Sequence, residues 1–166
     1  MTEATLLRAG RRPILSFERH LPRPVADVWH AVTDADGLKT WFPTRIEIDE
    51  WRVGATLTHH FDGSTMPSLP GTVLAYDPPR RLSFTWSNDI ITFELSPTPD
   101  GGTRFVLSEE LDANHVARNA AGWESCLDRL VNGDGHFDWQ SRFEHYSTEF
   151  TPTFGEQEGP PTAVKP

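Results

Sequence analysis

Apolar residues in the N-terminal third change their spacing once, from every second position to helical spacing. Alternation over Ile14–Leu21 predicts a strand, and Pro22 ends it because proline cannot donate to a central ladder. Four apolar residues then recur at helical spacing and share one face: Val25, Val28, Trp29 and Val32. Asp34 can cap a second, short helix that ends before Pro43. The chain is therefore expected to begin with a strand, a helix and a short helix.

Six short segments of strand-like composition follow, each bounded by Gly, Pro, Asn or Asp. They are Arg45–Asp49, Ala55–Phe61, Gly71–Asp77, Arg81–Trp86, Ile90–Ser96 and Thr103–Leu111. Their connections are mostly tight, as in the turn Ser87-Asn88-Asp89, and tight turns favour antiparallel pairing over long parallel crossovers. We therefore predict one curved antiparallel sheet of about six or seven strands.

Helical spacing returns in the C-terminal third. Between Asp112 and Asn132, one face carries Val116, Ala120, Trp123, Leu127 and Leu130, which predicts a long helix across the sheet. Trp139–Phe150 repeats aromatic residues at intervals of four, three and four, which predicts one more amphipathic helix. The predicted fold class is α+β, with an N-terminal extension at 1–13, one domain at 14–150 and a flexible, proline-containing tail at 151–166.

Composition narrows the partners and the compartment. The chain has 166 residues and a formal net charge of -9, which fits one domain and disfavours binding to a phosphate backbone. For this reason we expect no nucleic-acid partner. No stretch approaches the roughly 18 apolar residues of a membrane span, so we expect no membrane insertion. The single cysteine excludes an intrachain disulfide, and the N-terminus lacks a signal-peptide pattern. A cytoplasmic protein is the expectation.

Strand parity predicts which side chains face the long helix. His59 shares its parity with Leu57 and Phe61, and Glu109 shares its parity with Phe105 and Leu107, so both polar residues should point inward. The remaining inward positions are aromatic or aliphatic. This pattern favours an apolar cavity with a few polar groups, as a site for a small hydrophobic ligand requires. The alternative is a closed core with His59 and Glu109 at the strand rims.

The usual signatures of catalysis are missing. His59 and His60 are adjacent on a strand and point to opposite faces, so they cannot bind one metal ion, and no metal or cofactor is expected. Cys126 lies among apolar neighbours on the long helix, which favours an inert, packed thiol. His59 and Glu109 could act as a general base and an orienting carboxylate beneath Trp123. The sequence favours plain binding over this catalytic reading.

Several motifs are individually weak but occur in an informative order. They are PVADVWHAVTD from Pro24 to Asp34, Leu38, Trp41-Phe42, Val53-Gly54, Gly71-Thr72-Val73, Asp77-Pro78-Pro79-Arg80-Arg81-Leu82, Trp86, Gly102-Thr103, Gly122-Trp123, Leu127 and Leu130. Over about Ile14 to Phe150 the chain resembles the START-like SRPBCC superfamily. Within it, the chain is similar to the branch homologous to activators of the ninety-kilodalton heat-shock chaperone's ATPase.

This resemblance implies a helix-grip fold, in which the sheet curls around the long helix and two short helices close one end. It also implies a deep cavity, which other members use for lipids, sterols, polyketides or plant hormones. The implied ligand-binding residues here are Trp41, Phe42, His59, Phe61, Trp86, Phe93, Glu109, Trp123 and Cys126.

Three functions follow from the resemblance and the residues together. The first is binding of a small hydrophobic or amphipathic molecule. The second is a cyclase or dehydratase of the polyketide type that uses His59 and Glu109. The third is an interaction protein, a chaperone partner or regulator, for which Trp139–Phe150 would provide a contact with a chaperone or a second copy. True chaperone activators carry a separate chaperone-binding domain, which the thirteen residues before Ile14 are too short to contain, so chaperone activation is not expected.

Overall fold

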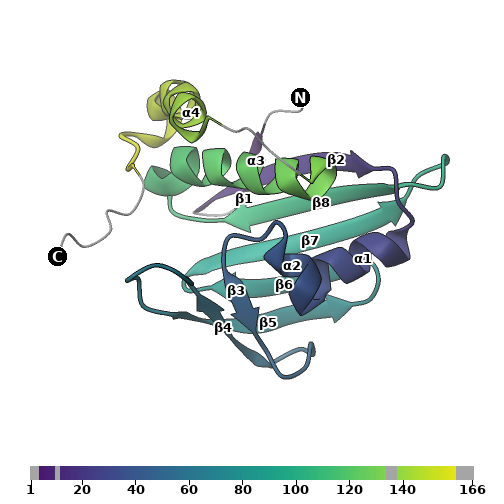
Figure 1. Cartoon of the computed structure of the whole chain (residues 1–166). Coiled ribbons are helices and arrows are strands. Elements are labelled where there is room, and N and C mark those ends of the chain that lie inside the picture. Colours follow the sequence, from purple (N-terminus) through teal and green to yellow (C-terminus); the bar gives the residue numbers. More distant parts are fainter. Residues whose placement is uncertain (1–3, 10–11, 134–137, 160–166) are drawn as a thin grey trace.

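The computed structural model describes residues 4–9, 12–133 and 138–159. Its strands form one antiparallel sheet in the order β1-β2-β8-β7-β6-β5-β4-β3 (Figure 1). The strands are β1 (Thr5–Ala9), β2 (Arg12–Leu21), β3 (Arg45–Glu47), β4 (Thr56–His60), β5 (Leu69–Asp77), β6 (Arg81–Trp86), β7 (Asp89–Pro97) and β8 (Thr103–Glu110). The helices are α1 (Val25–Thr33), α2 (Ala35–Lys39), α3 (Val116–Asn132) and α4 (Trp139–Phe154), with a short 3₁₀ turn at Ala113–His115.

This architecture confirms the predicted α+β class and the antiparallel sheet. One strand, β1, falls in the predicted N-terminal extension and pairs with β2, Thr5 lying opposite Ser16. Its five residues, TLLRA, contain no apolar–polar alternation, and only pairing with a neighbour makes them a strand. The sequence gives no signal for such an edge strand.

Local capping sets the start of the short helix α2 as expected. The Asp34 side chain accepts a hydrogen bond from the backbone N–H of Asp36 at 3.1 Å and caps α2. Helix α1 lies against β7, while α3 lies across the sheet and contacts β2 (Figure 1). The helices thereby cover the apolar face that strand parity predicts, and the buried core lies between them and the sheet.

Helix α4 packs on α3 through a buried polar contact (Figure 1). Glu124 of α3 is 2% exposed, and the Arg142 guanidinium donates to its two carboxylate oxygens at 2.6 and 2.8 Å. The Tyr146 hydroxyl donates to the same carboxylate. The buried face of α4 includes Tyr146 and Phe150, so its apolar residues face this domain. This contact positions Trp139, the first residue of α4, beside α3.

The structure corrects the predicted start of the tail at Thr151. Helix α4 continues to Phe154, because Pro152 stands in the last turn, where its missing N–H costs one hydrogen bond without ending the helix. The chain then returns to the start of α3, where the Gln157 side chain accepts from the backbone N–H of Ala117 at 2.9 Å. The backbone N–H of Glu158 donates to the Asn114 carbonyl at 2.9 Å. Residues 160–166 of the predicted tail lie outside the described residues.

Candidate functional site

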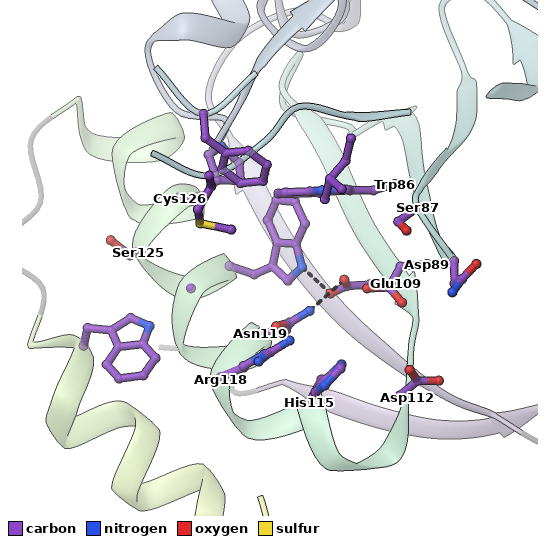
Figure 2. A pocket seen from close by; sticks show the side chains of 18 of the residues that line it. Trp86, Ser87, Asp89, Glu109, Asp112, His115, Arg118, Asn119, Ser125 and Cys126 are labelled. Carbon is purple, nitrogen blue, oxygen red and sulfur yellow. Dashed lines mark hydrogen bonds between the residues drawn. The ribbon is translucent and has the colours of Figure 1, made fainter. Parts of the chain in front are cut away.

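A cavity of about 610 Å³ lies between α3 and the sheet (Figure 2). One wall is a single face of α3 from His115 to Arg129, a distance of about 21 Å at 1.5 Å per residue. The opposite wall comes from the turn between β6 and β7 and from residues that follow β4, including Phe61. Trp139 of α4 adds an aromatic side chain at one edge. The cavity is therefore built from elements that are distant in sequence.

Gly122 leaves the middle of the α3 wall open. A methyl group built at its Cα would meet no heavy atom of another part of the protein within 4 Å. Glycines that are kept for tight packing behave differently: at Gly71 such a methyl group would lie 2.2 Å from the Thr85 carbonyl oxygen. The space in front of Gly122 is thus cavity space rather than a close helix–sheet contact.

Glu109 is the most deeply buried polar group of the cavity. It is 2% exposed on β8, where its Oε1 accepts from the Asn119 side-chain amide at 2.9 Å and its Oε2 accepts from the Trp123 indole N–H at 2.6 Å (Figure 2). The neighbouring Asp89 carboxyl group interacts with it electrostatically. Burial, reinforced by the negative charge of Asp89, raises the pKa of Glu109 to about 8. Glu109 is therefore largely protonated at neutral pH.

Strand register brings Asp89 to this position. Ile91 of β7 lies opposite Glu109 of β8, and Asp89 is two residues before Ile91, on the same face. Burial also raises the pKa of Asp89. Asp89 was not predicted as a cavity residue because the sequence around it is typical of a turn. Its parity with Ile91 and Phe93 could have indicated that it faces the cavity.

Most other charged groups around the cavity are held in ion pairs, whereas the Arg129 guanidinium donates to the Trp41 carbonyl oxygen and to the Cys126 sulfur. The Arg12 guanidinium lies 3.0 Å from Asp89 and 3.3 Å from Asp112. Across the cavity, Glu158 lies 3.1 Å from His115 and 3.8 Å from Arg118. The segment that returns to α3 thus places a carboxylate beside the Arg118 guanidinium at that end of the cavity.

His59 is buried beside the cavity but does not line it. Its Nδ1 lies 3.0 Å from the Thr44 hydroxyl, and its Nε2 lies 3.2 Å from the Thr85 carbonyl oxygen. A carbonyl oxygen only accepts, so Nε2 carries the proton and Nδ1 accepts from Thr44. Burial lowers the pKa of His59 to about 4, which keeps the ring neutral, and the ring stacks on Trp86 at 4.8 Å. Both nitrogens are occupied by protein partners, none of them Glu109.

The structure divides the nine residues inferred from the family resemblance into two groups. Five line the cavity: Phe61, Trp86, Glu109, Trp123 and Cys126. The other four, Trp41, Phe42, His59 and Phe93, fill the buried core behind that wall instead. Phe42 is the link between the groups, with its ring centre 5.6 Å from Trp123 and 5.8 Å from Trp86. Parity indicates which face a side chain is on but not how deep it lies, which explains this division.

Neither strand parity nor the family resemblance identifies several other residues that line the cavity. Pro43, Met66 and Leu69 lie in or next to connections, and Trp139 belongs to a helix whose docking direction the sequence does not show. Asn119 is the exception, because it lies four residues before Trp123 on the same face of α3. Helical spacing alone could have placed Asn119 beside Glu109.

Cys126 lines the cavity and is buried. Burial raises the pKa of its thiol to about 11, although Arg129 lies close to its sulfur at 3.4 Å. The thiol therefore stays protonated and is a poor nucleophile at neutral pH.

Neither a metal-binding cluster nor a membrane-spanning helix is found among the described residues. Within the three described ranges, no three or more His, Cys, Asp and Glu side chains are grouped so as to hold a metal ion. None of the helices described here is long and apolar enough to cross a membrane.

An antiparallel sheet that curves around a long helix, with a cavity between them, defines a START-like protein of the helix-grip class. Residues 22–132 match the model of the family described as Activator of Hsp90 ATPase homolog 1-like protein. The match covers more than half of the chain, so the chain belongs to this family. No curated protein matches its sequence.

Solved structures of similar proteins agree with this assignment. The conserved protein of unknown function EF2215 from Enterococcus faecalis is 25% identical with a TM-score of 0.76, covering 90% of this chain and 91% of that one. The AHSA1-like protein from Aeromonas hydrophila is 25% identical with a TM-score of 0.60, covering 75% and 97%. CalU16 from Micromonospora echinospora, at 23% identity and a TM-score of 0.65 over 88% and 93%, shares the fold.

Proposed function

We propose that the protein binds a small hydrophobic or amphipathic molecule in the cavity along α3. The observation that carries this proposal is the cavity itself, about 610 Å³ with aromatic walls and a few polar groups. Ligand sites in proteins commonly enclose roughly 300–1,000 Å³ and combine apolar walls with a small number of polar atoms. Phe61, Trp86 and Trp123 provide the apolar surface, and Glu109 provides the fixed polar group.

The cost of Gly122 to the stability of α3 is a second argument for this proposal. A glycine within a helix costs about 1 kcal/mol relative to alanine because the backbone loses more freedom on folding. A larger residue would meet no neighbour at this position, so packing does not account for the glycine. A ligand that occupies the space beside α3 does account for it.

The geometry favours binding over the cyclase-type alternative. That alternative requires His59 to accept a proton from a ligand, but both of its nitrogens are bonded to Thr44 and Thr85, and its side chain does not line the cavity. Glu109 remains in the cavity wall without a histidine partner. Its role in the proposed function is to orient the polar end of a bound molecule.

The interaction alternative rested on the apolar residues of Trp139–Phe150. Tyr146 and Phe150 are buried in the structure, and α4 packs on α3. A chaperone or a second copy that used these two residues would first have to displace α4 from its own domain. The structure therefore favours the cavity over this segment as the binding site.

A titration with the neutral probe 1-pyrenemethanol tests the proposal. We expect saturable one-to-one binding, seen as energy transfer from tryptophan to pyrene, and a rise in the melting temperature because the ligand binds only the folded state. Phe61→Ala, in the cavity wall, should weaken binding. Leu74→Ala, an apolar truncation at a residue that is 45% exposed on β5, should leave it unchanged. Absence of saturable binding by both 1-pyrenemethanol and the aliphatic probe 1-dodecanol would refute the proposal.

A further inference from the structure

The buried end of the cavity wall contains two neighbouring carboxyl groups, Glu109 and Asp89, which interact electrostatically. The hydrogen-bond partners of Glu109 are the neutral N–H donors of Asn119 and Trp123 (Figure 2). Among the described residues, no arginine or lysine is in hydrogen-bond contact with Glu109. Its negative charge, when present, is thus stabilised by neutral dipoles alone.

Positive groups near this pair are already engaged with other anions. Arg12 is shared between Asp89 and Asp112, at 3.0 and 3.3 Å. His115 and Arg118 on α3 face Glu158, at 3.1 and 3.8 Å. Glu110 also lies 3.9 Å from Arg12, so one guanidinium serves three carboxylates next to Glu109, which leaves an excess of negative charge at this end of the cavity.

Aromatic rings border the same space. Trp86 and Trp123 meet edge to face, with ring centres 6.3 Å apart and planes at 82°. Phe61 lies 6.0 Å from Trp86. Aromatic faces attract cations, most strongly where water is excluded. Aromatic walls combined with a buried acid are the surroundings that stabilise an organic ammonium ion.

We propose that the cavity selects ligands with a basic nitrogen, whose ammonium group donates hydrogen bonds to Glu109 and Asp89 while its apolar body lies against Phe61 and Trp86. This inference rests on the proposed function, because it names the class of molecule that the same cavity binds. The net charge of -9 on the chain also favours the approach of a cation.

On binding, the ammonium ion of the ligand replaces the proton held by Glu109. Before binding, Glu109 holds a proton at neutral pH, because its pKa lies at about 8. When the ammonium ion binds, both carboxylates accept hydrogen bonds from its N–H groups and the proton of Glu109 leaves to the solvent. Ammonium affinity should therefore rise with pH between 6 and 8, as the competing proton is removed. A neutral ligand that accepts a hydrogen bond from protonated Glu109 would show the opposite dependence.

Three probes with one ring system test the proposal: 1-pyrenemethylamine, 1-pyrenemethanol and 1-pyrenecarboxylate. We expect the ammonium probe to bind about tenfold more tightly than the alcohol at pH 7, and the carboxylate more weakly than either. Calorimetry in buffers of different ionisation enthalpy should detect release of about one proton per ammonium ion bound and none for the alcohol.

Glu109→Gln should bring the affinities of amine and alcohol within about threefold of each other and abolish proton release, because it keeps the shape of the side chain and removes its charge. Asp89→Asn should reduce the preference in the same way and serves as the second variant if Glu109→Gln fails to fold. Glu94→Gln makes the same chemical change on the exposed side of β7 and should retain the full preference.

The outcomes separate this inference from the proposed function. If the alcohol binds and Phe61→Ala weakens it, but the amine shows no preference, the cavity function stands and the ammonium inference is overturned. A preference that survives in both Glu109→Gln and Asp89→Asn would overturn it as well. If neither the three probes nor 1-dodecanol binds, the proposed function fails together with the inference.

Discussion

The indole N–H of Trp123 donates a 2.6 Å hydrogen bond to Glu109 and joins α3 to β8 at the cavity wall. The indole lowers the pKa of Glu109, while burial and the nearby Asp89 raise it. Burial and Asp89 prevail, and the pKa lies at about 8. The ring of Trp123 thus forms part of the apolar wall while its N–H holds the acid in place.

Trp123→Phe should keep the aromatic wall and remove this donor. We expect a loss of about 1–3 kcal/mol in the free energy of unfolding, because a buried carboxyl group loses a partner. The loss should be larger at pH 9 than at pH 6, since a hydrogen bond to a charged acceptor is stronger. Urea denaturation at both pH values measures this difference, and equal losses would contradict the assignment.

Glu109 should make the protein less stable as the pH rises. The folded protein keeps a proton on Glu109 up to a pKa of about 8, whereas the unfolded chain releases it near 4.5. Its contribution is therefore fully present below pH 4.5 and is lost between 4.5 and 8, with a slope of up to about 1.4 kcal/mol per pH unit. Glu109→Gln should remove this slope in urea denaturation from pH 6.5 to 9, above the range in which His59 contributes. A wild-type stability that rises over this interval would count against a protonated Glu109 in the folded protein.

His59 should act in the opposite direction. Its pKa of about 4 in the folded protein lies below the ordinary value of 6.5, so the unfolded chain takes up a proton first as the pH falls. Stability from neutral His59 should be present above pH 6.5 and decrease by about 3 kcal/mol towards pH 4. His59→Gln should flatten this acid limb of an unfolding profile, while His30→Gln on the surface should preserve it. An unchanged acid limb in His59→Gln would show that His59 is not held neutral.

The docking of α4 should depend on the charge of Arg142. Arg142→Met leaves the buried carboxylate of Glu124 with the hydroxyl of Tyr146, and we expect a loss of about 2–4 kcal/mol in unfolding free energy. Removing both charges in Arg142→Met/Glu124→Met should recover a large part of that loss, since the uncompensated charge is then absent. A double variant that is less stable than the single one would contradict this account.

The sequence predicted most of the fold because its signals are local. Apolar alternation and tight turns identified β4 to β8, and the Asp34 cap placed α2. Strand β1 was missed because pairing, rather than its own side chains, makes it a strand. The end of α4 was missed because Pro152 suggested a break, while packing of the buried face on α3 outweighs one missing hydrogen bond.

The candidate site was less predictable because it depends on depth and long-range contacts. Parity correctly predicted that His59 and Glu109 point inward, but the contact of His59 with Thr44 depends on the connection before β3, whose path the sequence does not show. Trp139 reaches the cavity only through the docking of α4. Such contacts require the assembled tertiary structure.

Gly122→Leu tests the central claim most directly, because it adds a side chain in the cavity wall at a position where a Cβ meets no heavy atom of another part of the protein within 4 Å. We predict that the variant is as stable as the wild type or more so, by up to about 1 kcal/mol, because leucine favours the helix. Its affinity for 1-pyrenemethanol should fall at least about tenfold. Gly122→Ala, which gains similar helix stability but adds only a methyl group, should retain binding. Unchanged affinity in a folded Gly122→Leu protein would contradict the account, since the probe would then bind outside the cavity along α3.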